Sequence, residues 1–378
     1  MRFTILVQPY MRRRGEDVKN PGADPDRYQD FLQRLKEQMI FADNNGYGGF
    51  CMTEHHMQIE GIETTVNPIM LDLFVAQHTK NLMVGQMGMA LTAHNPMKLA
   101  EDLALLDQMT EGRCFYGFVR GNTPRWLNTF SQHLEISTSQ SDKSEVDQKN
   151  RRLFYEAFEI IKQLWHNDTI NFQDGEFWQM PPKDIPWQFP PTKKWGDESA
   201  IDANGNLHEV GLVPKPLKRP DGRAHPEIWT PFSWSMETAC FAAKEEIKLA
   251  SFVAKDEFID TTIDVYTEEA AKYGRTVQPK DFIGIGGHLT MASTQAKADD
   301  HYKGFEELFN GAYNCPPYHV PMGRVWKGTG QETLDTIAKF REEKGIDNFF
   351  LWHHVGYFEQ EEELEMLETF SEQVIKKL

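Results

Sequence analysis

Two adjacent histidines follow a short apolar run, in the stretch Thr53-Glu54-His55-His56. Imidazole titrates near neutral pH, so a histidine here could give or take a proton during catalysis. Successive side chains of a strand face opposite sides, so only one of the two histidines could enter a given pocket. On spacing alone, either His55 is catalytic or both histidines only pack. No third metal ligand stands at a helical or CxxC spacing, so we expect no metal site.

Arg120 ends a second apolar run, residues 114–119, and Gly121 follows it. A guanidinium at the end of a buried strand needs an anion, because burying it unpaired is costly. One interpretation is a salt bridge to Glu54. The other is a phosphate group, since the planar guanidinium matches phosphate oxygens in a fork.

A third set of polar groups lies at 231–236, where a strand is expected to lead into a helix. Hydroxyl groups and backbone N–H groups at a helix N-terminus suit a phosphate, which makes Ser233 and Ser235 candidates. The alternative is ordinary N-capping, which serine performs in many helices.

The elements that would position these residues alternate along the chain. Residues 99–109 show one apolar helix face that ends near Glu111-Gly112, and a buried strand follows. Eight strand-like runs separated by helical segments predict an α/β fold, a (β/α)8 TIM barrel. A doubly wound open sheet is second, because no GxGxxG follows the first strand. The eight expected strands are 3–7, 49–53, 82–91, 114–119, 228–231, 248–253, 282–291 and 348–353.

Two irregular stretches interrupt this pattern. Residues 167–225 are rich in Pro, Gly, Trp and charge and contain turn signals, including Asp202 to Gly205. Residues 311–330 are irregular as well. We predict one domain, 1–378, whose long insertions occupy loops at the C-terminal face of the barrel, where such loops usually serve function.

Composition excludes several classes. The net charge of −17 and the lack of an extended basic patch argue against nucleic acid and anionic membrane surfaces. No apolar run approaches the length of a membrane span, and the N-terminal apolar segment is too short for a signal peptide. The four cysteines stand far apart, which is typical of reduced thiols. We therefore expect a cytoplasmic protein.

Three passages carry a resemblance to a known family: TEHH at 53–56, NPMKLAEDL at 95–103, and LLDQMTEGRCFYGFVRG at 105–121. They resemble the bacterial luciferase-like flavin-dependent monooxygenases. The likeness runs from residue 1 to about residue 120 and returns more weakly from residue 226, whereas 168–225 resembles nothing recognisable. The family fold is the TIM barrel.

The resemblance also assigns roles. It places His55 in the flavin pocket, with Glu54 beside it as a second catalytic candidate. It implies that Arg120, Arg151 and Ser233 bind the flavin phosphate, whereas Ser235 is a candidate from its place at the helix start. Without the resemblance, Arg151 is an ordinary first-turn arginine that faces solvent. The remaining flavin-binding candidates form the Met87-Gly88 peptide, which matches a cis peptide of the family.

By the same resemblance, the chain would be a two-component monooxygenase. It would bind FMN as FMNH2 from a separate flavin reductase, form a C4a-hydroperoxide with O2, and oxygenate a small organic substrate. The family suggests a homodimer packed through residues 69–77 and 99–109. Val119 stands where luciferase has a reactive cysteine, so light emission is not implied.

Three other functions remain open. The superfamily includes deazaflavin (F420)-dependent oxidoreductases, which transfer hydride and need no reductase. A non-catalytic flavin-binding barrel is possible on the same fold. A glycoside hydrolase needs two carboxylates at strand ends, and only Glu54 qualifies clearly.

Overall fold

The computed structural model describes residues 1–378 except 139–141, 232–234, 253–254 and 317–319. The chain divides into two compact units. The first comprises Met1–Gly88, Arg113–Phe118 and Glu227–Leu378, and the second comprises Met89–Gly112 and Val119–Pro226.

The first unit holds a closed barrel of parallel strands. β10 pairs with β1 through Leu6 and Trp352 and with β8 through His288 and Trp352, so the ring has no free edge. This closure confirms the predicted (β/α)8 barrel and excludes the open doubly wound sheet. The ring consists of β1 (Arg2–Pro9), β2 (Gly49–Met52), β3 (Met83–Gln86), β5 (Cys114–Val119), β6 (Ile228–Pro231), β7 (Lys248–Ser251), β8 (Ile283–Leu289) and β10 (Asn348–Val355).

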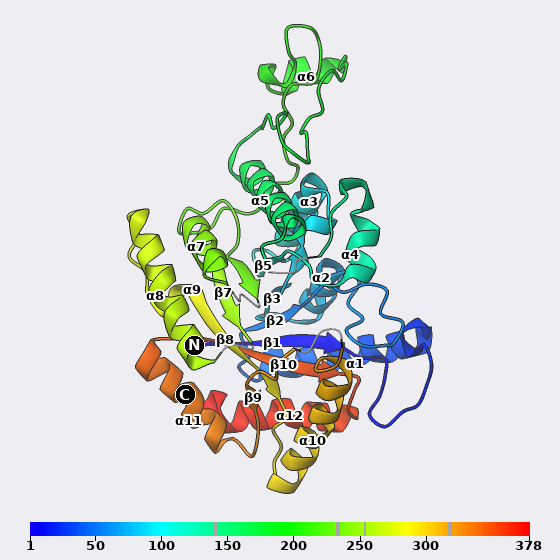
Figure 1. Cartoon of the computed structure of the whole chain (residues 1–378), viewed down its shortest axis with the longest axis vertical. Coiled ribbons are helices and arrows are strands. Elements are labelled where there is room, and N and C mark those ends of the chain that lie inside the picture. The colour runs from blue at the N-terminus through cyan, green and yellow to red at the C-terminus, as the bar shows by residue number, and fades with distance from the viewer. Residues whose placement is uncertain (139–141, 232–234, 253–254, 317–319) are drawn as a thin grey trace. The chain divides into compact units, whose positions relative to one another are not determined.

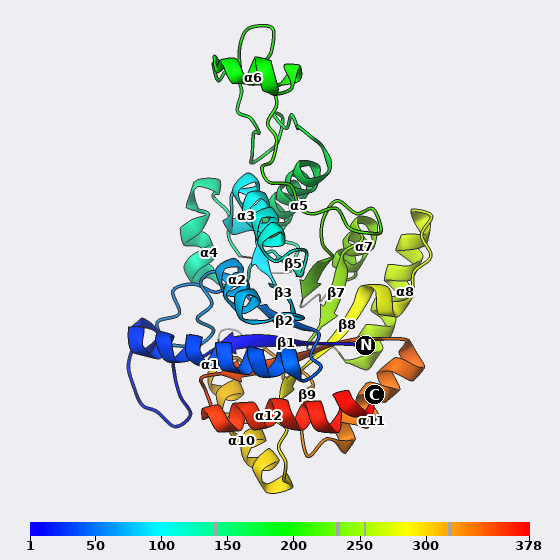
Figure 2. The same ribbon diagram turned by 180° about the vertical axis from the view of Figure 1, so that it is seen from behind.

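Helices surround these strands. In both Figure 1 and Figure 2, α1 and α12 lie on the outer side of β1 and β10. The helices of this unit are α1 (Pro25–Asn44), α2 (Pro68–His78), α7 (Met236–Glu245), α8 (Asp256–Lys272), α9 (Pro279–Phe282), α10 (Gln295–Ala312), α11 (Gln331–Lys344) and α12 (Gln360–Gln373), with 3₁₀ turns at Pro21–Ala23 and Ile375–Lys377. A short strand, β9 (Val325–Trp326), pairs in parallel with β8 and lies within the stretch expected to be irregular.

Side chains fill the barrel interior. Strand register places alternate residues inward, and one buried cluster draws on six of the strands and on the residues that follow β3 and β7. The interior is therefore a packed core, as in other barrels of eight strands. Its members are Leu6, Cys51, Met87, Phe115, Trp229, Ala250, Phe252, Phe350 and Trp352.

The second unit is mainly helical. It contains β4 (Met89–Ala90), α3 (Pro96–Met109), α4 (Pro124–Phe130), α5 (Glu145–His166), α6 (Pro190–Trp195) and 3₁₀ turns at Leu91–Ala93, Gln132–Leu134 and Glu198–Ala200. α3 packs on α5, and the segment that carries α6 extends away from α5 in Figure 1. Antiparallel bridges join Phe172 to Met180 and Ile201 to Leu207 within residues 167–225.

Close packing of β5 makes a stability prediction. A Cβ at Gly117 would lie 2.0 Å from the backbone oxygen of Gln86, which cannot rotate away. Gly117→Ala is expected to lower the free energy of unfolding by about 1–3 kcal/mol, the usual cost of overpacking. Gly311 in α10 is the control, because its Cβ would meet nothing within 4 Å. Denaturant titration measures both variants, and an equal effect in the two would contradict the argument.

Candidate functional site

His55 lies in the loop that follows β2, where the sequence predicted a catalytic residue. Its backbone N–H donates to the carbonyl of Thr65 at 2.8 Å, which fixes the loop at this point. Its Nε2 lies 3.4 Å from Oε2 of Glu63, and the His55 side chain is 15% exposed. Its Nδ1 is buried and has no hydrogen-bond partner in the described part of the chain.

The neighbouring residues form a separate pair. His56 Nε2 lies 3.1 Å from Oε1 of Glu54, whose side chain is 1% exposed. Thr53 meanwhile exchanges hydrogen bonds with Gln8 on β1. The two histidines thus have different carboxylate partners, although both lie in a loop after β2 and not on the strand whose alternation was expected to separate them.

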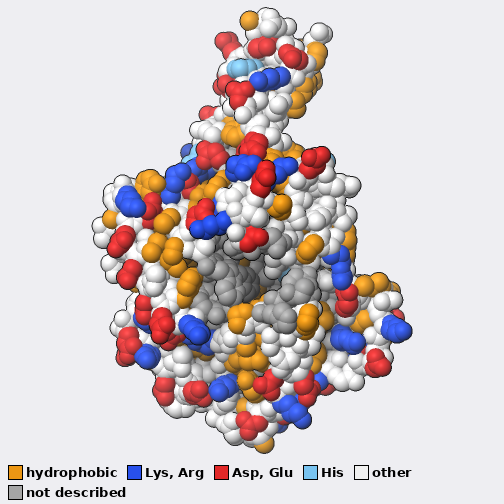
Figure 3. All heavy atoms as spheres, in the orientation of Figure 1, with side chains coloured by type: hydrophobic (Ala, Val, Ile, Leu, Met, Phe, Trp, Pro, Cys, Tyr) orange, Lys and Arg blue, Asp and Glu red, His pale blue; other side chains and the backbone are white. Residues whose placement is uncertain are grey.

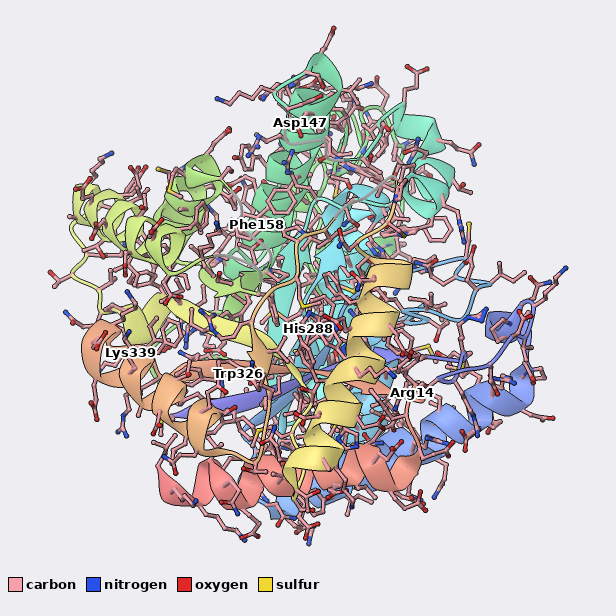
Figure 4. All side chains as sticks on the ribbon, turned by 60° about the horizontal axis from the view of Figure 1, so that its bottom comes forward. Arg14, Asp147, Phe158, His288, Trp326 and Lys339 are labelled. Carbon is pink, nitrogen blue, oxygen red and sulfur yellow. The ribbon has the colours of Figure 1, made fainter. Side chains whose placement is uncertain are left out.

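Inward-facing polar residues gather at the C-terminal ends of β1, β8 and β10. Tyr10 directly follows β1, while the register of β8 and β10 places His288 beside Trp352 and turns His354 to the same side. His288 Nδ1 lies 3.2 Å from His354 Nε2, and His354 Nδ1 lies 3.2 Å from the Tyr10 hydroxyl. His288 lies among the strands in Figure 4.

His353 differs from its neighbour His354. It lies near the C-terminal end of β10. Its side chain faces outward, however, and Nε2 bonds to Gln38 of α1 at 2.9 Å. The reason is the alternation of the strand, which turns His354 inward and His353 toward the helices.

α10 covers the inward-facing histidines. Phe305, Phe309 and Tyr313 follow one another at intervals of four residues and so share one helix face. The Phe305 ring lies 4.4 Å from that of His288 and 5.5 Å from that of His354. Burial lowers the pKa of His288 to about 3 and holds the pKa of His354 well below its ordinary value. Both imidazoles are therefore neutral at physiological pH.

The second unit positions the arginine that follows β5. The Arg120 carbonyl accepts from Thr92 Oγ1 at 2.8 Å and from Asn150 Nδ2 at 3.2 Å. Its guanidinium Nη1 donates to Oδ1 of Asp147 at 2.8 Å. Asp147 is fully buried near the start of α5 (Figure 4). The structure therefore supplies a carboxylate partner that the sequence interpretation did not name.

Arg151 stands one helical turn after Asp147. Residues four apart share a helix face, so the guanidinium groups of Arg120 and Arg151 approach the same part of α5. Arg151 is 5% exposed and its Nη1 lies 3.4 Å from the Tyr155 hydroxyl. The reading of Arg151 as a solvent-facing arginine is therefore wrong. The adjacent Arg152 is exposed and pairs with Glu176.

This difference between neighbours predicts a difference in ligand binding. If Arg151 binds the flavin phosphate, as the resemblance implies, Arg151→Ala is expected to weaken the binding of reduced FMN by about 1.5–3 kcal/mol, the range for a hydrogen bond to a charged group. Arg152→Ala should change it by less than about 0.5 kcal/mol, as for an exposed ion pair. Anaerobic titration measures both. Equal losses would remove Arg151 from phosphate recognition.

The remaining candidates are in the first unit. The Met87–Gly88 peptide bond is cis, as the resemblance implies. Ser235 caps α7, since its Oγ accepts from the backbone N–H of Thr238 at 3.2 Å. This contact is the capping arrangement that the sequence left open beside phosphate binding. Ser233 lies outside the described residues.

Sequence reasoning missed Glu63 and Tyr313. The Tyr313 hydroxyl donates to Oε1 of Glu63 at 3.0 Å across 250 positions of sequence. Neither residue belongs to a periodic segment or a short motif. The left-handed backbone of Glu63, at φ 54°, is also not visible in sequence. No local sequence pattern could have predicted that these two residues lie near His55.

The described residues were compared with what a metal site and a membrane-spanning helix require. No three His, Cys, Asp or Glu side chains there are grouped so that they could hold a metal ion. None of the helices there has the length and apolar character needed to cross a membrane. Figure 3 shows acidic and basic side chains interspersed over the visible face.

The closed parallel barrel thus carries two histidine–carboxylate pairs in the loop after β2, at the end of the strands where barrels of this kind place their active sites. The model of the luciferase-like monooxygenase family matches residues 16–356. The chain belongs to this family of flavin monooxygenases.

Curated relatives agree with that assignment. The 3,6-diketocamphane 1,6-monooxygenase of Pseudomonas putida is 26% identical over 364 residues, covering 93% of this chain and 84% of the relative. The alkanal monooxygenase alpha chain of Photobacterium leiognathi is 28% identical over 147 residues, or 39% of each chain. The relatives are oxygenating enzymes, which makes this chain a member of an oxidoreductase family.

Solved structures share the fold at low identity. The oxygenating constituent of 3,6-diketocamphane monooxygenase from Pseudomonas putida, a type II Baeyer–Villiger enzyme in complex with FMN, superposes with a TM-score of 0.67. It is 20% identical, with 100% of this chain and 98% of that chain covered. An F420-dependent secondary alcohol dehydrogenase gives a TM-score of 0.63 at 14% identity, covering 99% and 98%. The fold alone is therefore common to both cofactor types.

Proposed function

We propose that this protein is a monooxygenase that uses reduced FMN and O2 to oxygenate a small organic substrate, with FMNH2 supplied by a separate flavin reductase. The observation that carries the proposal is His55. In a chain of the luciferase-like monooxygenase family, it presents one nitrogen to a carboxylate and leaves the other without a partner among the described residues.

The donor set suits the phosphate of FMN. Arg120 and Arg151 bring two guanidinium groups to one turn of α5, and guanidinium groups bind phosphate oxygens through charge-assisted hydrogen bonds. We propose that both bind the phosphate, with Ser233 and Ser235 as further donors at the start of α7. Met87 and Gly88 are proposed to contact the flavin. When bound, the flavin supplies the oxygen-activating chemistry.

His55 is proposed to move a proton during oxygen transfer. An imidazole with a free lone pair at Nδ1 can accept a proton there, and the nearby carboxylate of Glu63 stabilises the resulting cation. Glu54 is the second catalytic candidate, with its orientation set by His56. We further propose that the protein acts in the cytoplasm as a homodimer.

The test is an anaerobic titration of the purified protein with FMNH2 and, separately, with reduced deazaflavin F420. We expect FMNH2 to bind and F420 to bind at least tenfold more weakly, after which O2 is admitted with candidate substrates. Tight binding of F420 with hydride transfer would contradict the proposal and favour an F420-dependent oxidoreductase. A solved structure with the same fold is an enzyme of that kind. Binding of flavin with no turnover across many substrates would favour the non-catalytic barrel.

A further inference from the structure

A continuous set of hydrogen bonds leads from the barrel interior to the carboxylate beside His55. It passes from His288 to His354, Tyr10, Tyr313 and Glu63, with distances of 3.2, 3.2, 2.5 and 3.0 Å. All five residues belong to the first unit. Their positions in sequence span β1, the loop after β2, β8, the end of α10 and β10, so only the closed barrel brings them together.

The donor-to-acceptor direction of these hydrogen bonds follows from the two ends of the series. Glu63 as a carboxylate can only accept, so Tyr313 donates to it and must itself accept from Tyr10. Tyr10 then accepts from Nδ1 of His354, which leaves Nε2 of His354 to accept from Nδ1 of His288. At the far end, Nε2 of His288 is buried without a partner among the described residues. A lone pair there is less costly than an unpaired N–H, which agrees with the same direction.

Burial keeps the two tyrosines and the two histidines of this series in their neutral forms. The pKa values of Tyr10 and Tyr313 are raised well above the ordinary value, first by burial and then by the charge of Glu63. The pKa values of the two histidines are lowered by burial. Tyr10, Tyr313 and the two histidines therefore stay neutral near neutral pH, which agrees with the donor-to-acceptor direction derived above.

Backbone hydrogen bonds fix the loop on both sides of Glu63. The N–H of Thr64 donates to the carbonyl of Pro9 at 3.2 Å, and that of His55 donates to the carbonyl of Thr65. Glu63 itself has a positive φ of 54°, a region that side chains other than Gly, Asn and Asp seldom occupy. Such residues persist where the surroundings over-determine them, which is common at functional sites.

We propose that Glu63 is the positioning residue of His55. Tyr313 fixes Oε1 of the carboxylate, so Oε2 faces Nε2 of His55 and holds the imidazole proton on that nitrogen. His55 then keeps Nδ1 as its only basic atom. The hydrogen-bonded series of His288, His354, Tyr10 and Tyr313 orients Glu63 and does not itself release a proton. The catalytic consequence rests on the proposed function, whereas the tautomer does not.

The tautomer is measured directly on the flavin-free protein. Long-range ¹H–¹⁵N correlation of ¹⁵N-histidine protein distinguishes an Nε2–H from an Nδ1–H imidazole, and His55→Gln identifies the signals by their loss. We expect the Nε2–H form in the native protein and a mixture of forms, or the Nδ1–H form, in Glu63→Gln. An unchanged Nε2–H pattern in Glu63→Gln would overturn the proposal.

Tyr28 provides a matched control for Tyr313. The Tyr28 hydroxyl donates to the carbonyl of Thr64 at 3.4 Å, so it contacts the same loop without touching Glu63. Tyr313→Phe should lower product formed per flavin oxidised about tenfold, the low end for loss of an orienting partner, with FMNH2 affinity unchanged. Tyr28→Phe should leave that ratio within about twofold. Equal losses would mean that the loop needs only its general stability.

The two hypotheses can fail separately. If the tautomer shifts in Glu63→Gln but the native protein forms no oxygenated product from FMNH2 and O2, the positioning role stands and the proposed function fails. If product forms but the tautomer and the Tyr313→Phe product ratio are unchanged, the proposed function stands and the positioning role fails. Thermal melting confirms that each variant is folded before either comparison.

Discussion

Replacing His55 by alanine is expected to lower product formation about 10²-fold or more, which is the usual contribution of a general acid–base group. The loss follows from the geometry. Nδ1 of His55 is buried without a partner among the described residues, and Nε2 lies 3.4 Å from the carboxylate of Glu63, which would balance a positive imidazolium. Flavin oxidation should continue, with O2 diverted to H2O2.

His56→Ala is the matched comparison. His56 is next in sequence and also faces a carboxylate, Glu54, at 3.1 Å. Its loss should lower stability, because the buried Glu54 loses a partner, and should leave the ratio of product to H2O2 within about threefold of the native ratio. Product, H2O2 and oxidised flavin are measured in the same reaction for both variants. An unchanged ratio in His55→Ala would make His55 a packing residue.

Reduced FMN should still bind to His55→Ala with native affinity, because the proposed phosphate contacts come from Arg120 and Arg151. A parallel loss of binding would show that the substitution disturbed the cofactor and not a proton transfer. The affinity for reduced FMN and the ratio of product to H2O2 are therefore measured separately for His55→Ala.

The barrel itself was predictable because its periodic signals are local. β5 and β6 begin and end at the expected residues, since each is a short, mainly apolar run. The third strand is shorter than expected. A Cβ at Gly88 would lie 2.6 Å from the backbone of Gly117, and this close approach coincides with the break between β3 and β4.

The site was predictable only where motifs marked it. TEHH placed His55 after a strand, and the resemblance selected Arg151 over Arg152, a choice that burial supports. Asp147, Glu63 and Tyr313 were missed because their importance depends on contacts between distant segments. Sequence periodicity specifies which face of an element is buried, but it does not specify which polar groups meet across a closed barrel.

The second prediction with a large expected effect concerns Arg120. Its ion pair with Asp147 makes the single variant Arg120→Ala hard to interpret. Removing Arg120 alone leaves the fully buried Asp147 without its 2.8 Å ion pair, which is costly to stability whatever else Arg120 does. The informative protein is therefore the double variant Arg120→Met, Asp147→Asn, compared with Asp147→Asn alone. Methionine keeps the apolar stem, and asparagine removes the buried charge.

Relative to Asp147→Asn, the double variant should bind reduced FMN about 2–4 kcal/mol more weakly, as expected for loss of a buried charge-assisted contact. Reduced riboflavin has the same ring but no phosphate, so its affinity should change by less than about 0.5 kcal/mol. The difference between the two ligands isolates the phosphate from any rearrangement of α5, because a displaced helix would affect both alike. Equal weakening for FMN and riboflavin would therefore assign Arg120 to the architecture of the second unit and leave phosphate recognition to Arg151.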